Sequence, residues 1–273
     1  MKSNKNKPTE TSEHSYLFDH FSIKIMMRDL RFSRSAYRPE QTIPDIKVTT
    51  DKGETTMLYE MAKAKPLLLV TGSITCPMTI SSLALLNDLQ ANMADKINIA
   101  LVYVREAHPG EHYPQPCNID EKRRHAQDFK ENYLINFPVI IDELDGPLHK
   151  ILDVKPNSAH IIDATGNILF QSLWAGDTKS IQDAVEQLAN RLAVKRKLSE
   201  SMLLPFFRGA GFMHDTLNLA GKRAYKELLY GAPPVWVLSR LASLFTFMPR
   251  QKQGGMSAVL LISVFVFFVI VFW

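Results

Sequence analysis

The sequence predicts an α/β fold in which a central mixed sheet has helices on both faces, followed by a helical basic extension and a C-terminal transmembrane helix. Short and wholly apolar runs are typical of strands buried on both faces. Stretches with apolar residues three or four positions apart follow these runs and indicate helices. The final 18 residues carry no charged side chain. With 273 residues, 46% of them hydrophobic, the chain is long enough for one full core and an appendage.

The predicted strands and helices alternate through the middle of the chain. They are a hairpin within 42–56, a strand at 67–70, a helix from 77 to 93, a strand at 97–104, a helix at 120–133, a strand at 138–142, a hairpin of 159–163 with 168–171, and a last helix with Ile181, Val185, Leu188 and Leu192 on one stripe. Alternation followed by a closing hairpin and helix predicts a mixed sheet covered on both faces.

Cys76 is the first residue that points to chemistry. It follows the apolar strand and precedes Pro77, and proline is favoured in the first turn of a helix. The free N–H groups and the positive dipole end of that helix favour a thiolate, which is the nucleophilic form of sulfur. A small buried hydrophobic residue is the alternative role for Cys76.

An ionisable turn that holds Glu106 and His108 follows the strand at 97–104. Open α/β sheets bind ligands at the carboxyl ends of their strands, so we expect His108 to lie near Cys76. Histidine titrates near neutrality, and we expect His108 to give a proton to a leaving group while Glu106 orients or charges it. A surface turn of ordinary ionisable residues is the alternative.

The two cysteines, Cys76 and Cys117, do not form a disulfide framework and suggest a reducing compartment. Attack by Cys76 would leave an oxidised sulfur that a second thiol must reduce. Cys117 is the internal candidate, and a solvated bystander is its alternative role. The other reductant is an external thiol such as thioredoxin or glutathione. The sequence has no metal-ligand spacing and no glycine-rich phosphate loop, so it predicts neither a metal nor a bound cofactor.

The end of the chain predicts a membrane anchor. As a helix, residues 256–273 would span roughly 27 Å, about the thickness of a hydrocarbon core. Residues 191–252 hold eleven Lys or Arg and three acids, a net charge of +8 against +4 for the whole chain. This placement favours anionic lipid over nucleic acid, for which no motif is present. Apolar segments at 203–207 and 235–245 would lie on the membrane or pack on the preceding domain.

Three motifs in order resemble the iodothyronine deiodinases, a family with a thioredoxin-like fold close to the peroxiredoxins: Gly72-Ser73-Ile74-Thr75-Cys76-Pro77, Glu106-Ala107-His108-Pro109 and Phe137-Pro138-Val139. The resemblance covers roughly residues 40–190. It implies that Cys76 stands where the family has the selenocysteine that attacks the halogen. It further implies that Glu106 and His108 handle protons and substrate. Lys122 aligns with a family arginine, and Ser73 is placed like the threonine of the peroxiredoxin Thr-x-x-Cys motif.

These observations predict four regions: a mostly disordered or extended segment at 1–39, a redox domain at 40–192, a basic helical membrane-proximal extension at 193–255, and a transmembrane tail anchor at 256–273. We expect a membrane-anchored thiol oxidoreductase with its redox domain on the cytoplasmic side and one C-terminal span. Cys76, His108 and Glu106 would act on a small-molecule electrophile such as a carbon-bound halogen. The supporting residues would be Ser73, Thr75, Cys117 and Lys122.

Two alternatives stay open at this point. One is a peroxiredoxin-like thiol peroxidase, and the other is a non-catalytic membrane-anchored scaffold on the same fold. The expected partners are the electrophile, a thiol reductant and a lipid membrane, without nucleic acid. A homodimer is also compatible with the sequence.

Overall fold

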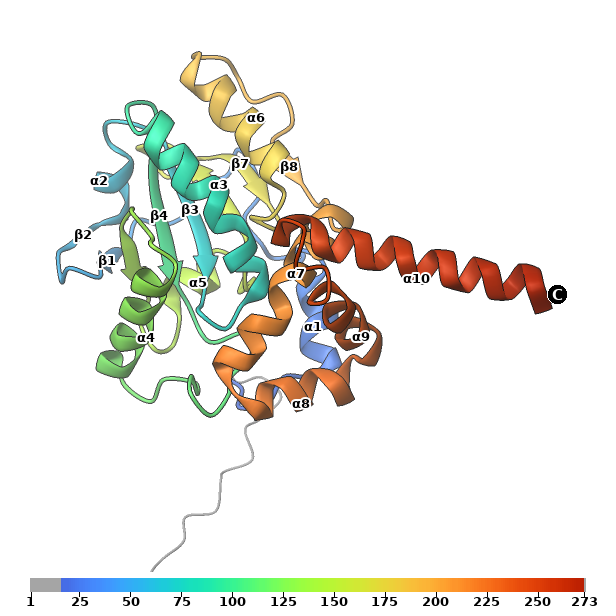
Figure 1. Cartoon of the computed structure of the whole chain (residues 1–273). Helices are drawn as coiled ribbons and strands as arrows, with labels where there is room; N and C mark the ends of the chain where they lie inside the picture. The colour runs from blue at the N-terminus through green and yellow to red at the C-terminus, as the bar shows by residue number, and fades with distance from the viewer. Residues whose placement is uncertain (1–15, 273) are drawn as a thin grey trace, which may run out of the picture.

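The computed structural model describes residues 16–272, and its centre is a six-stranded mixed sheet with helices on both faces (Figure 1). The strand order is β5-β4-β3-β6-β7-β8. These strands are β3 (Leu67–Gly72), β4 (Asn98–Tyr103), β5 (Val139–Ile141), β6 (Ala159–Ile162), β7 (Ile168–Ser172) and β8 (Leu198–Ser199). Strands β3, β4 and β5 are parallel, β6 is antiparallel to β3 and to β7, and β8 is parallel to β7.

Side chains of the central strand β3 alternate between two hydrophobic clusters, and all six of its residues are buried. Leu68 and Val70 pack against α3 (Pro77–Met93), α4 (Ile119–Asn132) and α6 (Thr178–Ala189). Leu67 and Leu69 pack on the opposite face against α2 (Leu58–Ala62), α5 (Pro147–Ile151) and the hairpin of β1 (Lys47–Thr49) and β2 (Thr55–Met57). The predicted thioredoxin-like fold is confirmed.

Several short elements are absent from the sequence prediction, namely α2, α5 and β8. The predicted stripe of the last helix also differs at one position, because α6 ends at Ala189 and Leu192 is 57% exposed. Helices α2 and α5 and strand β8 have only two to five residues, too few for a periodic pattern to show.

The N-terminal segment, which the sequence predicts to be mostly disordered or extended, contains one short helix in its described part. Helix α1 (Ile23–Asp29) begins after Ser22, whose hydroxyl accepts the Ile25 N–H at 3.4 Å. The Phe21 N–H donates to Glu227 at 2.8 Å, which ties this segment to the C-terminal extension. Helix α1 therefore depends on tertiary contacts that its own sequence does not reveal. Residues 1–15 lie outside the described part of the chain.

The basic extension is helical, as predicted, and consists of α7 (Leu203–Ala220), α8 (Lys222–Gly231) and α9 (Pro233–Ala242). It packs on the redox domain, which is one of the two arrangements that the sequence allows. Gly209 of α7 approaches α3 so closely that an added Cβ would lie 2.3 Å from the sulfur of Met78. Helix α7 therefore covers the N-terminal end of α3.

Helix α10 (Arg250–Phe272) projects away from the rest of the molecule (Figure 1). Its most apolar 18-residue window has a mean hydropathy of 2.6, so the helix is long and apolar enough to cross a membrane. It begins six residues before the predicted span at 256.

Candidate active site

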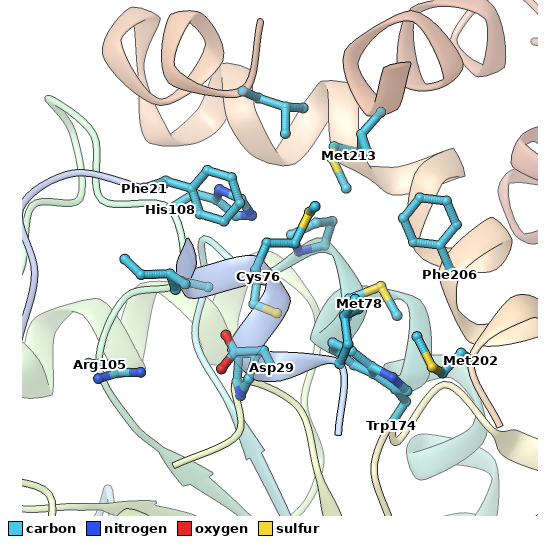
Figure 2. Close-up of a pocket in the computed structure, with 18 of the residues that line it drawn as sticks. Phe21, Asp29, Cys76, Met78, Arg105, His108, Trp174, Met202, Phe206 and Met213 are labelled. Carbon is cyan, nitrogen blue, oxygen red and sulfur yellow. The ribbon is translucent and has the colours of Figure 1, made fainter. Parts of the chain in front are cut away.

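A cavity of about 330 Å³ lies where the start of α3 meets α1 and the extension (Figure 2). Its walls come from three parts of the chain. Residues such as Cys76 and Trp174 belong to the redox domain, Asp29 belongs to α1, and Phe206 and Met213 belong to α7. Most lining residues are apolar, so a ligand with a large apolar body fits the cavity.

Cys76 caps the N-terminus of α3, as the sequence predicts. Its backbone is extended, with φ −101° and ψ 106°, and Pro77 occupies the first turn. Gly72, at the end of β3, allows the strand to approach this turn, because an added Cβ would lie 2.4 Å from Cγ2 of Thr79. Strand β3 and helix α3 thus place the sulfur in the cavity.

The thiolate predicted for Cys76 is not favoured in this structure. The residue is only 2% exposed, and its burial raises the pKa of the thiol above the usual value of 9.0. The hydroxyl and N–H of Thr79 and the N–H of Met78 lower this pKa, as a helix N-terminus should, but burial outweighs them. The charge of Asp29 raises the Cys76 pKa further.

His108 lines the same cavity, as predicted, but its expected titration near neutrality is wrong. The side chain is 7% exposed, and burial lowers its pKa from 6.5 to about 4. Its ring lies against Phe21 of the N-terminal segment, with centroids 4.4 Å apart. The Nδ1 atom has no hydrogen-bond partner among residues 16–272. His108 is therefore a neutral imidazole with one nitrogen free for a ligand.

Glu106 does not orient His108 directly, contrary to the prediction. Its carboxyl oxygens accept from the hydroxyls of Thr75 at 2.6 Å and Tyr103 at 2.5 Å, and contact Nδ1 of His125 at 3.1 Å. The Thr75 hydroxyl oxygen in turn accepts a hydrogen bond from the backbone N–H of His108 at 3.2 Å. Glu106 therefore acts on the His108 turn through the Thr75 hydroxyl.

Ser73, Lys122 and Cys117 do not line the cavity. The Ser73 hydroxyl accepts the Ala107 N–H at 3.2 Å, so the hydroxyl beside the sulfur belongs to Thr79 instead. Lys122 is buried, and its Nζ donates to the Glu143 carbonyl at 3.1 Å.

Cys117 is a free, exposed thiol whose N–H donates to Glu121 at 2.8 Å. The structure does not bring it to Cys76, which is buried inside the cavity.

Sequence reasoning missed the other ionisable groups of the cavity, Asp29 and Arg105. Asp29 is 8% exposed and lies beside Cys76 (Figure 2), and burial raises its pKa to about 6. Arg105 is 5% exposed and lies over the ring of Phe18, 4.8 Å from its centroid. The spacing of Met26, Asp29 and Leu30 is that of one helix face and was the available signal for Asp29.

Sequence reasoning also missed Thr79, for which a signal exists. Residues two and three positions into a helix direct their N–H groups at the capping side chain. Thr79 is the third residue after Cys76, so its N–H and hydroxyl both influence the sulfur. No group of three or more His, Cys, Asp or Glu side chains that could hold a metal ion is found in residues 16–272.

The sheet topology and a cysteine at the start of the helix after the central strand define a class, the thiol-dependent oxidoreductases of thioredoxin fold. Within this class the chain belongs to the iodothyronine deiodinase family, because the model described as iodothyronine deiodinase matches residues 1–171. The match starts and ends earlier than the resemblance noted in the sequence. Because it stops within β7, helices α6 to α10 lie beyond it.

The comparison with solved structures found matches of low sequence identity. Peroxidoxin BcpB from Mycobacterium tuberculosis is 12% identical with a TM-score of 0.42, and the alignment covers 56% of this chain and 97% of that one. The thioredoxin domain of a thiol-disulfide oxidoreductase from Bacteroides vulgatus is 16% identical with a TM-score of 0.42, over 55% and 99%. An uncharacterized conserved protein from Geobacillus kaustophilus is 13% identical with a TM-score of 0.48, over 60% and 89%. The comparison with curated proteins found no match.

Proposed function

We propose that the chain is a membrane-anchored thiol oxidoreductase that removes a halogen reductively from an apolar aromatic substrate. The observation that carries this proposal is the shared cavity of Cys76 and His108, which brings the sulfur and a free imidazole nitrogen together among mostly apolar lining residues. A halogenated phenol has the apolar body, the polar group and the soft electrophilic atom that such a cavity suits.

The reaction balances with two external thiols. The Cys76 thiolate attacks the halogen, so a sulfur–halogen bond forms while the carbon–halogen bond breaks. The carbon keeps the bonding electron pair and takes a proton from the N–H of the neutral His108 imidazole, whose other nitrogen receives a proton from solvent. One external thiol then displaces halide to give a mixed disulfide, and a second releases Cys76 as a disulfide product forms.

An external reductant is required on this proposal because Cys117 lies outside the cavity. The rate of the attack should rise with pH above neutrality, because burial raises the Cys76 pKa and only the thiolate attacks. Glu106 and Thr75 are positioning residues, since they hold the turn that carries His108.

Peroxide reduction is a second candidate. The Thr79 hydroxyl acts on the sulfur and Arg105 lines the same cavity, so both could polarise a peroxide O–O bond. The products would be a sulfenic acid on Cys76 and an alcohol or water, and external thiol would reduce the sulfenic acid.

The test uses the full chain in detergent with dithiothreitol and either an iodinated phenol or hydrogen peroxide. We expect iodide release that disappears in Cys76→Ala and persists in Cys117→Ser. Consumption of peroxide alone would favour the second candidate. Consumption of neither substrate, with Cys76 resistant to iodoacetamide, would favour a non-catalytic scaffold.

The proposed anchor is α10, a single span with the redox domain on the cytoplasmic side. The exposed apolar side chains of α10 and the basic extension before it support this placement.

A further inference from the structure

Helix α7, which covers the cavity, packs directly against α10. An added Cβ at Gly211 of α7 would lie 2.0 Å from the Arg250 carbonyl oxygen, and one at Gly254 of α10 would lie 2.0 Å from the Phe207 carbonyl oxygen. Gly211 therefore lies opposite Arg250, and Phe207, four residues earlier in α7, lies opposite Gly254, four residues later in α10. The two helices run antiparallel in close contact, joined by glycines.

The same register gives the level of the cavity mouth. Moving one further turn back along α7 from Phe207 reaches Leu203, which falls level with Ala258 of α10. This level lies within the uncharged segment that begins at Met256. Phe206 lines the cavity and also packs against a cluster that includes Ala258.

The cavity reaches the molecular surface at this level. Met202 and Leu203 line it and are 37% and 72% exposed, and the adjacent Leu204 is also 72% exposed. Three consecutive exposed apolar side chains therefore stand at the mouth, beside the helix proposed to enter the bilayer. In water this arrangement is unfavourable, whereas in contact with lipid tails it is not.

The inner part of the cavity differs from its mouth. Two nearly buried polar atoms, Oδ1 of Asp29 and Nδ1 of His108, have no hydrogen-bond partner among the described residues, although Oδ1 of Asp29 lies 3.8 Å from Nε of Arg28 in an ion pair. Both residues line the cavity together with Cys76. Buried polar atoms without a hydrogen bond are costly, and a ligand with a hydrogen-bonding head would satisfy them.

We propose, on the basis of the function proposed above, that the cavity takes its substrate from the lipid phase. The substrate would be an uncharged lipophilic electrophile that enters between Met202 and Leu203. Its polar head would meet Asp29 and His108, and its halogen or other soft atom would meet Cys76. The reaction itself is unchanged from the one written above.

The test measures access to Cys76 without requiring turnover. The full chain carrying Cys117→Ser is reconstituted in phosphatidylcholine vesicles and treated with either an N-dodecylmaleimide or a sulfonated, membrane-impermeant maleimide. Intact-protein mass then follows modification of Cys76. We expect the lipid-soluble reagent to react faster, and Leu203→Glu to slow it by about tenfold or more, because a charge at the mouth opposes passage of an alkyl chain.

Leu192→Glu is the matched control, since Leu192 is an exposed leucine that does not line the cavity. This variant should react like the parent protein. Met202→Glu tests the mouth a second time, and thermal unfolding checks that all variants remain folded. Equal reactivity of the two maleimides, or equal effects of Leu203→Glu and Leu192→Glu, would overturn the lipid route, as would a Cys76 that neither reagent modifies. Preferential labelling by the dodecyl reagent without any halide release would support the route and count against the proposed function alone.

Discussion

His108→Phe should remove a defined part of the acid sensitivity of folding. The neutral imidazole is buried against Phe21 and has a pKa of about 4, whereas an unfolded histidine keeps its ordinary value of 6.5. Between these values the unfolded chain binds more protons at this site than the folded chain. The free energy of unfolding therefore falls at this site as the pH falls from about 6.5 towards 4.

The size of this effect follows from the two pKa values. Between about pH 7.5 and 4.5, preferential protonation of the unfolded state lowers the free energy of unfolding of the wild-type protein by about 2.5 kcal/mol at His108. Buried His149 and His160 also have lowered pKa values, but they are present in both proteins and cancel in the difference. Over this pH range, the free energy of unfolding of His108→Phe should therefore fall by about 2.5 kcal/mol less than that of the wild-type protein.

The assay is urea unfolding of the full chain in detergent, followed by circular dichroism at both pH values. His112→Phe is the control, because His112 lies outside the cavity, and it should keep the wild-type pH dependence. If the free energy of unfolding depends on pH in the same way in wild type and His108→Phe, His108 is solvated and its buried position is refuted.

Three further predictions concern the thiol, the network and the anchor. Asp29→Asn should lower the pKa of Cys76 and speed its alkylation near pH 8 in a background without the exposed cysteine, because the Asp29 charge raises that pKa. Glu106→Gln should lower the free energy of unfolding by about 2 kcal/mol in a urea titration, because an amide nitrogen replaces one of the accepting oxygens. Val264→Arg combined with Phe267→Arg should release the chain from carbonate-washed membranes, since each arginine costs roughly 3 kcal/mol at the centre of a span.

Each of these predictions has a matched control. Asp183→Asn and Glu131→Gln change exposed side chains on α6 and α4 and should leave alkylation and stability unchanged. Leucine at both anchor positions should keep the chain in the membrane. An unaltered alkylation rate in Asp29→Asn would contradict an effect of the Asp29 charge on the pKa of Cys76. Wild-type stability of Glu106→Gln would contradict its buried network, and retention of the double arginine variant would contradict a span.

The positions of Cys76 and His108 could be predicted because they depend on local signals. Pro77 after an apolar strand places the cysteine at a helix start, and the carboxyl ends of the parallel strands β3 and β4 meet at one edge. Their titration could not be predicted in the same way. Burial is the largest influence on both pKa values, and the cavity that holds both residues is lined in part by α1 and α7, which are distant in sequence.

The partners of Glu106 show a second limit of sequence reasoning. Its carboxyl group meets Thr75 from the β3–α3 turn, Tyr103 from β4 and His125 from α4. Side chains from three elements converge only once the fold is known. In the same way, the apolar residues of α7 suit a membrane surface and a protein interior equally well until their neighbours are known.

The most direct measurement is a single turnover without added thiol. The reduced full chain carrying Cys117→Ser is mixed with one equivalent of an iodinated phenol, and both the deiodinated product and the iodoacetamide-reactive thiol are quantified by mass spectrometry. We predict product formation matched one for one by loss of alkylatable Cys76, and no product from the same protein with Cys76→Ala. Product formed while Cys76 stays fully alkylatable, or formed by the alanine variant, would contradict the assignment of this sulfur as the nucleophile.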